Sequence, residues 1–261
     1  MQIFVINLPS ATERSKLQKD QLTKLNLEYK ILDATSAEDI SEDTYKKHYF
    51  DWQRPLRKTE VACYYSHRSA WNRVIKSKKP ALILEDDAIL SMFLPELLDN
   101  LNAIQNTDLI NLENRSRKKF VSRSYVDIVC NSKLLKLYQD RSGAAGYILW
   151  PSGAKKLIQL EKNSGIGLAD AHITACQELK SYQVEPSPII QLDQCKLYGI
   201  KNAYSEIVSK STVSVSDNYK GSAYFIMKRA LYQLNLALKQ LFILTKSQRR
   251  YIKIRNSDFN V

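Results

Sequence analysis

The feature that most constrains the fold is a regular alternation of short apolar segments with longer amphipathic ones. The short segments are predicted to be buried strands at residues 2–7, 29–32, 81–84, 108–112 and 144–150. The longer segments are predicted to be helices at residues 11–27, 59–78 and 93–104, with a further helix that has Pro151 in its first turn. This alternation predicts an α/β domain with a mostly parallel central sheet, which binds ligands where its strands end.

The charge of the chain is unevenly distributed. Its 261 residues include 39 Lys and Arg against 27 Asp and Glu, for a formal net charge of +12. Residues 218–257 hold nine basic residues and no acid, which leaves 30 basic and 27 acidic residues elsewhere. We therefore predict a nearly neutral domain over residues 1–216, and a polar linker followed by a basic helix over residues 217–261.

The cysteines and the hydropathy pattern indicate a cytoplasmic protein. Cys63, Cys130, Cys176 and Cys195 lie far apart and form no Cys-x-x-Cys pair, so we expect reduced thiols and no zinc site. The opening residues show no secretory signal, and no apolar run reaches the ~18 residues that a membrane span needs.

Three consecutive carboxylates follow the strand predicted at 81–84. Glu85, Asp86 and Asp87 would repel one another unless a cation or hydrogen-bond donors compensate their charges. Mn²⁺ or Mg²⁺ suits such oxygen ligands and would in turn hold a diphosphate. The alternative interpretation is that they are ordinary loop acids that cap the next helix.

The helix predicted at 59–78 carries polar groups on an apolar face. Glu60, His67 and Trp71 share this face with Cys63 and Tyr64. A buried glutamate and histidine require partners. The two interpretations are a Glu60–His67 hydrogen bond that fixes the helix on the sheet, and a functional site.

Five motifs occur in order over roughly residues 1–195. They are INLPS at 6–10 with Arg14, ExACxxSH at 60–67, LEDDA at 84–88, GYILWPSGA at 146–154, and Asp170. In order and spacing they resemble glycosyltransferase family 25, which includes bacterial lipooligosaccharide glycosyltransferases and collagen galactosyltransferases. Two departures, Ala62 for the usual glycine and Trp150-Pro151 for small polar residues, would affect helix packing or the acceptor pocket and leave the carboxylates intact.

The resemblance implies a GT-A fold, a Rossmann-like domain that transfers a sugar from a nucleotide sugar to an acceptor hydroxyl. It implies that Asp87 binds Mn²⁺ or Mg²⁺, which bridges the two phosphates. Glu85 would hold the ribose or belong to the metal shell, and Asp86 would support the sugar or its loop. His172 is a further candidate metal ligand.

The resemblance also suggests donor-binding and catalytic residues. Asn7 and Pro9, at the end of the first strand, would lie beside the nucleotide. Arg14 would reach phosphate oxygens unless it is simply solvated, and Asp33 would bind the nucleotide unless it caps a helix.

An inverting transfer needs a base for the acceptor hydroxyl. Asp170 is the first candidate, with a plain helix N-cap as its alternative, and Glu113 is the second candidate.

These implications predict metal-dependent, inverting transfer of a hexose, with UDP-galactose as the expected donor, to a lipooligosaccharide core glycan. A metal-dependent phosphohydrolase and a non-enzymatic basic binding protein are the alternatives.

The basic segment at residues 224–254 is predicted to be one amphipathic helix. At 100° per residue, its lysines and arginines fall opposite its leucines. We expect this helix to bind the anionic inner leaflet, so that the protein is peripheral on the inner membrane. Packing on the domain or on a second subunit of a homo-oligomer is the alternative. Nucleic acid is disfavoured because no reader motif is present.

Overall fold

The structure is a computed structural model that describes residues 1–140, 143–201, 204 and 222–259. Within these residues a nine-stranded sheet has the order β11-β6-β7-β9-β5-β8-β3-β1-β2, and β4 and β10 form a separate two-stranded sheet. The strands are β1 (Gln2–Asn7), β2 (Lys30–Asp33), β3 (Ala81–Glu85), β4 (Ala88–Leu90), β5 (Leu109–Asn111), β6 (Lys119–Ile128), β7 (Ser132–Gln139), β8 (Gly146–Leu149), β9 (Ser181–Glu185), β10 (Ile189–Gln191) and β11 (Ser247–Arg250).

The large sheet is mixed, and the prediction of an α/β fold is confirmed. β1 pairs in parallel with β2 and β3, and β5 pairs in parallel with β9. β8 runs antiparallel between β3 and β5, and β6, β7 and β11 add further antiparallel pairs. The antiparallel part escaped prediction because strands β6, β7 and β11 were not predicted, and the apolar run of β8 carries no signal for its direction.

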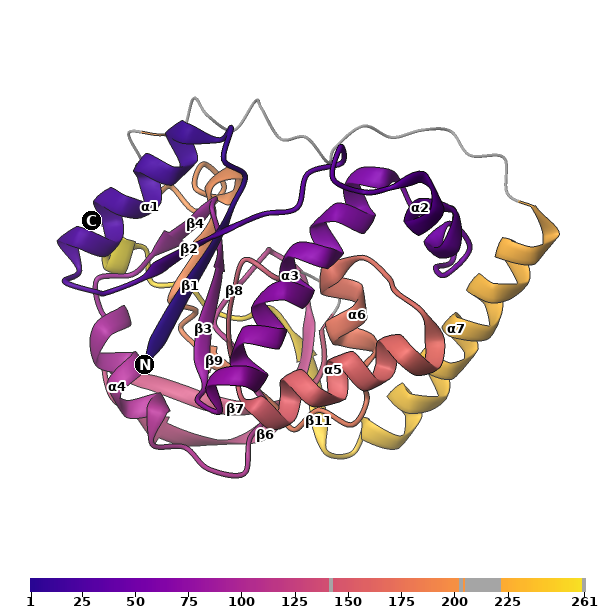
Figure 1. Cartoon of the computed structure of the whole chain (residues 1–261). Helices are drawn as coiled ribbons and strands as arrows, with labels where there is room; N and C mark the ends of the chain where they lie inside the picture. The colour runs from indigo at the N-terminus through magenta and orange to yellow at the C-terminus, as the bar shows by residue number, and fades with distance from the viewer. Residues whose placement is uncertain (141–142, 202–203, 205–221, 260–261) are drawn as a thin grey trace.

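Helices cover both faces of the sheet (Figure 1). α3 and α5 pack on one face, against Phe4 and Ile6 of β1, and α1 and α4 pack on the other, against Ile3 and Val5. This division follows from the twofold alternation of side chains along a strand. The helices are α1 (Thr12–Lys24), α2 (Glu42–His48), α3 (Lys58–Ser77), α4 (Leu94–Asn102), α5 (Pro151–Ser164), α6 (Ala169–Ala175) and α7 (Ala223–Ile243).

The register of the central strands brings several polar chain segments to one edge of the sheet. Ile6 pairs with Glu85, and Asn7 pairs with Asp33, so β1, β2 and β3 end together. β8 begins at this edge because it runs antiparallel to β3, and β5 ends there just before Glu113. This is the edge where ligands bind in α/β sheets.

The basic segment is shorter as a helix than predicted. α7 ends at Ile243, and β11 then joins the large sheet beside β6. The extra strand is stabilised by long-range contacts that no local pattern reveals; for example, Arg250 forms a salt bridge with Glu185, 2.7 Å at one nitrogen–oxygen pair. Most of the predicted linker, and the boundary at residue 216, lie outside the described residues. Among the helices that the structure describes, none has the length and apolar character to cross a membrane.

Candidate active site

The acidic loop after β3 is organised around Glu85. Glu85 Oε1 lies 3.1 Å from His67 Nε2, and its Oε2 accepts a hydrogen bond of 3.3 Å from Gln191 Nε2. Burial opposes ionisation of Glu85, but the hydrogen bond and charge of His67, with the charge of Arg115, outweigh it and hold the pKa of this carboxyl below its usual value. Glu85 is therefore a fixed negative charge whose two oxygens are both oriented.

The environment of Asp87 disfavours the negative charge of its side chain. Its Oδ1 is buried, and no described residue forms a hydrogen bond with it. Burial, followed by the charges of Glu85 and Asp86, raises the pKa of Asp87 to about 7. Its backbone carbonyl accepts a hydrogen bond of 2.9 Å from Leu192 N–H, so the loop is held in place while this side-chain oxygen is left without a partner.

Asp86 serves to anchor the loop to α1. Arg14 donates to Asp86 Oδ1 at 3.1 Å, and Gln18 Nε2 donates to the backbone carbonyl of Asp86, also at 3.1 Å. Burial raises the pKa of Asp86 even though Arg14 opposes this. Arg14 was predicted to reach phosphate, but in this structure its guanidinium forms a salt bridge with the Asp86 carboxylate.

Of the two interpretations of Glu60 and His67, the direct hydrogen bond between them is wrong. Glu60 is bound at both oxygens by Arg54, at 2.8 and 2.6 Å, and accepts the N–H of Arg57 at the start of α3. His67 instead bridges Glu85 and Tyr147, whose hydroxyl lies 3.0 Å from His67 Nδ1. Seven residues rise about 10.5 Å along a helix, which is too far for a direct hydrogen bond between the two side chains.

Cys63 joins the site although the sequence did not single it out as functional. Ligand atoms of Cys63, His67 and Glu85 lie within 4.8 Å of one another. Burial, together with nearby carboxylates including Glu85 and Asp170, raises the pKa of Cys63 and keeps its thiol protonated. The trio offers a thiol, an imidazole and a carboxylate, a mixed set of donors that differs from the all-oxygen set preferred by Mn²⁺ or Mg²⁺.

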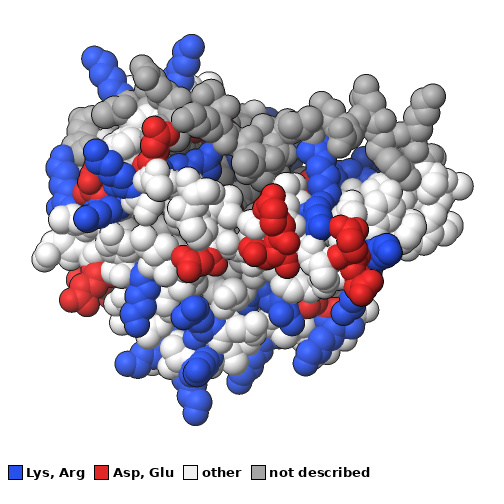
Figure 2. Space-filling model, turned by 45° about the horizontal axis from the view of Figure 1, so that its top comes forward, with Lys and Arg blue, Asp and Glu red and all other residues white. Residues whose placement is uncertain are grey.

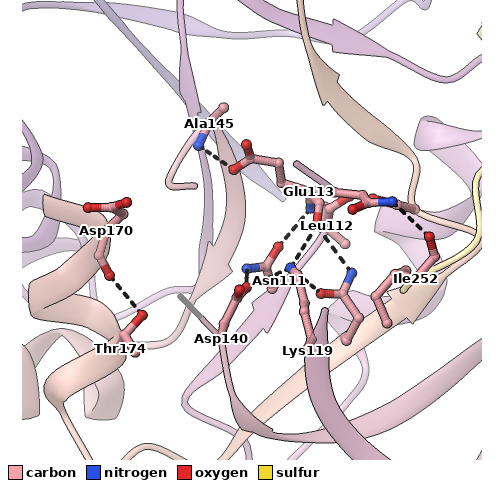
Figure 3. A network of polar contacts seen from close by, with 12 residues as sticks. Asn111, Leu112, Glu113, Lys119, Asp140, Ala145, Asp170, Thr174 and Ile252 are labelled. Atoms are coloured by element: carbon pink, nitrogen blue, oxygen red, sulfur yellow. Dashed lines mark hydrogen bonds and ion pairs between the residues drawn. The ribbon is translucent and has the colours of Figure 1, made fainter. Parts of the chain in front are cut away.

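Glu113 and Asp170 lie on either side of the segment that leads into β8 (Figure 3). Glu113 Oε2 accepts the N–H of Ala145 at 2.8 Å, while its buried Oε1 has no hydrogen-bond partner among the described residues. Burial and the charge of Glu85 raise the pKa of Glu113 well above its usual value. Gly143 has a φ of +80° and is so close that a side chain there would overlap the carboxyl group of Glu113.

Asp170 lies at the start of α6, as predicted. It is half-buried, and its Oδ1 accepts the N–H of Ala171 at 2.7 Å. The N–H of Gly143 also donates to this carboxylate. Burial, with the charge of Glu85, raises the pKa of Asp170 above its usual value, although the two N–H groups oppose this.

A buried lysine, Lys119, lies below Glu113 in Figure 3 and contacts its backbone. Lys119 is 1% exposed, lies 2.6 Å from Asp140 Oδ2, and donates to the backbone carbonyl of Glu113 at 2.9 Å. Its third partner is Gln183 Oε1, at 2.7 Å. Sequence reasoning missed this network because β6, β7 and β9, which supply most of it, were not predicted.

The remaining predicted residues divide into two groups. Asn7 is buried at the ligand-binding edge, with an Oδ1 that no described residue satisfies, and Pro9 and Asp33 are exposed at the ends of β1 and β2. His172 is not brought to the acidic loop. It stacks on Trp71 within the core, its Nε2 lies 3.0 Å from the carbonyl of Leu157, and burial lowers its pKa. A role for His172 as a metal ligand has no support in this geometry.

Glu85, Asp87, Glu113 and Asp170 form one electrostatic unit, and within it Asp87 and Glu85 are the candidate ligands for a hard divalent cation. Glu85 raises the pKa of Asp87, Glu113 and Asp170, so the four groups act on one another. The partnerless oxygen of Asp87, beside an ionised Glu85, supplies the oxygen donors that Mn²⁺ or Mg²⁺ prefers. Such a cation would relieve the repulsion that these pKa shifts express.

Comparisons with known proteins agree with the motifs. Residues 1–174 match glycosyltransferase family 25 (LPS biosynthesis protein). A putative glycosyltransferase of Haemophilus influenzae is 28% identical over 171 residues, which cover 64% of this chain and 60% of that protein.

The alignments with two further relatives cover different shares of those proteins. Human procollagen galactosyltransferase 2 is 26% identical over 172 residues, 60% of this chain and 27% of that protein. The lipooligosaccharide biosynthesis protein lic2B of Haemophilus influenzae is 25% identical over 206 residues, 73% of this chain and 76% of that protein. The match to the family covers the acidic loop, Glu113 and Asp170, and on that basis the chain belongs to glycosyltransferase family 25.

Proposed function

We propose that this protein transfers a hexose from a UDP-sugar to a hydroxyl of a lipooligosaccharide core glycan, in a metal-dependent and inverting reaction. Galactose is the expected sugar, since several relatives are named galactosyltransferases. The acceptor class follows the name of another relative, a lipooligosaccharide biosynthesis protein. The observation that carries the proposal is the partnerless carboxylate oxygen of Asp87 beside Glu85, at the carboxyl end of a central strand.

The acidic loop would hold the metal through Asp87 and Glu85. When bound, Mn²⁺ or Mg²⁺ would neutralise the charge that develops on the diphosphate leaving group. His67 and Gln191 fix the orientation of Glu85, and the Arg14–Asp86 salt bridge holds the loop against α1. The loop is thus held in position before the donor arrives, which reduces the reorganisation needed during the reaction.

The donor nucleotide would lie along the ends of β1 and β2. Asn7 has a buried side-chain oxygen without a described partner and is therefore suited to a donor on the base or ribose. Pro9 and Asp33 line the exposed part of the same edge.

Asp170 suits the role of general base better than Glu113 does. The base must be ionised and within reach of the acceptor hydroxyl. Burial raises the pKa of Asp170 above its usual value, but Asp170 is only half-buried and accepts two backbone N–H groups that favour its ionised form. Glu113 is 1% exposed, and burial together with the charge of Glu85 raises its pKa well above the usual value, which disfavours its ionised form. Glu113 would instead position the segment around Gly143 and Ala145.

Replacing Asp170 with asparagine should lower the turnover number by about a hundredfold or more, because the variant cannot accept the proton of the hydroxyl. Glu113→Gln is the matched control. Glutamine keeps an oxygen that can accept the N–H of Ala145, so we expect less than about a tenfold loss. Steady-state kinetics would measure both, and calorimetry with UDP should give unchanged affinity. A larger loss of turnover in Glu113→Gln than in Asp170→Asn would assign the base to Glu113.

The reaction itself can be tested with purified full-length protein. It is incubated with a series of UDP-hexoses and a delipidated lipooligosaccharide core, in Mn²⁺, Mg²⁺ or EDTA. We expect UDP release that depends on the acceptor and on the metal, with a product heavier by one hexose in mass spectrometry. NMR of the new linkage would show inversion. Cleavage of simple phosphoesters without any dependence on acceptor would support a phosphohydrolase instead.

A further inference from the structure

Helix α7 turns its apolar side away from the protein. Its outward face carries large apolar residues that are between 48% and 81% exposed. They are Ile226, Met227, Leu231, Leu234, Leu238, Leu241 and Phe242. Contiguous exposed apolar surface of this kind marks a site of interaction in soluble proteins.

The opposite side of α7 faces the domain, and it includes basic residues. Phe225 is buried and stacks on Phe50 at 5.7 Å, and Lys228 donates to the backbone carbonyls of Phe50 and Asp51 at 2.8 and 2.7 Å. Lys239 is partly buried, and burial lowers its pKa. A surface helix ordinarily packs its apolar face on the domain and turns its charges to water, and α7 does the reverse.

The charge around this face indicates what covers it. Residues 218–257 contain no acid, and Arg229, Lys246 and Arg249 are exposed in or just after α7. In Figure 2 the right-hand margin, where α7 lies in Figure 1, is mainly uncharged, and Lys and Arg gather over the lower part of the same view. A second copy of the chain would bring two acid-free basic segments together, which like charges oppose, whereas anionic lipid headgroups attract them.

We propose that the outward face of α7 inserts into the interfacial region of an anionic lipid bilayer. The leucines and Phe242 would enter the boundary between headgroups and acyl chains, with Arg229, Lys246 and Arg249 beside the anionic headgroups.

The inner side of the same helix reaches the candidate active site. A small cavity of about 60 Å³ is lined by Asp140, Gly143, Asp170 and Lys239, among others. Gln240 also donates to Gln139 Oε1 at 3.1 Å, beside this cavity. One helix therefore separates the membrane-facing surface from the proposed base. If the proposed function holds, docking of α7 brings a lipid-anchored acceptor directly to the side of the site where Asp170 lies.

Vesicle binding by the full-length protein tests this proposal. Vesicles of phosphatidylcholine and phosphatidylglycerol, about 2:1, are compared with vesicles of phosphatidylcholine alone in a flotation assay. The test variant combines Leu231→Gln, Leu234→Gln and Leu238→Gln. The control variant combines Ile31→Gln, Val126→Gln and Leu197→Gln, which are also more than 40% exposed but lie outside α7. We expect the α7 variant to bind anionic vesicles at least about tenfold more weakly and the control to bind like wild type.

Two further comparisons test the role of charge and the alternative of self-association. Arg229→Gln with Lys246→Gln should weaken binding to anionic vesicles, and high salt should do the same. Equal binding by wild type and the leucine variant would overturn the proposal. A wild-type dimer that the leucine variant converts to monomer, without vesicle binding, would overturn it in favour of self-association. Transfer to a delipidated acceptor should be unchanged by these variants, so failure of the proposed function would show separately as absence of that transfer in wild type.

Discussion

Replacing Asp87 with asparagine should reduce sugar transfer by about a thousandfold or more while leaving the fold intact. Asparagine keeps the size of the side chain but removes its charge, so the acidic loop loses the oxygen that has no described partner. Burial together with Glu85 and Asp86 already raises the pKa of Asp87 to about 7, so removing its charge relieves repulsion. We therefore expect an unchanged or higher melting temperature together with the loss of activity.

The measurement pairs kinetics with metal binding. Transfer is assayed at saturating Mn²⁺, and Mn²⁺ affinity is followed by electron paramagnetic resonance on the same preparations. Asp127→Asn, an exposed carboxylate on β6, is the control and should match wild type in both. An Asp87→Asn protein that bound Mn²⁺ and turned over like wild type would show that the metal site lies elsewhere.

The parallel part of the fold could be predicted because its signals are local. The apolar runs at residues 2–7 and 81–84 are short, continuous and bounded by polar residues, as expected for strands buried on both faces. The position of Glu85 followed from this, since a residue just after such a strand must lie at the ligand-binding edge. Helix α3 was predicted within one residue at each end, because its apolar face repeats over five turns.

The partners within the site could not be predicted, because they come from distant segments. Glu85 depends on His67 and Gln191, which lie 18 and 106 residues away in the sequence. A helical wheel brought Glu60 and His67 to one face but did not show that two turns separate them. Only the assembled sheet determines that His67 faces Glu85.

The secondary structure of the segment after α7 also could not be predicted, because it depends on pairing with a distant strand. Its helical pattern of charges continues to residue 254, but the chain leaves the helix at Ile243. The edge of β6 offers unpaired backbone groups there, and pairing with β11 satisfies them. Tertiary context overrides local periodicity in this segment, and the basic residues beyond Ile243 therefore have separate roles.

Replacing Lys119 with methionine should lower the free energy of unfolding by about 3–5 kcal/mol. Lys119 is 1% exposed and forms a 2.6 Å ion pair with Asp140, which is itself buried. Methionine fills a similar volume but leaves the Asp140 carboxylate without its cation in a low-dielectric interior. Lys118→Met, at an exposed neighbouring position, is the control and should change stability by no more than about 1 kcal/mol. Urea denaturation would measure both.

A second substitution separates the charge from the packing. Adding Asp140→Asn to Lys119→Met removes the unpaired carboxylate, so the double variant should recover part of the lost stability. Lys119 also donates to the backbone carbonyl of Glu113, whose side chain holds the N–H of Ala145 beside the site. The double variant should therefore remain impaired in transfer even where its stability returns. If Lys119→Met were no less stable than Lys118→Met, the buried pair would not support the fold, and Glu113 would be positioned by its other contacts.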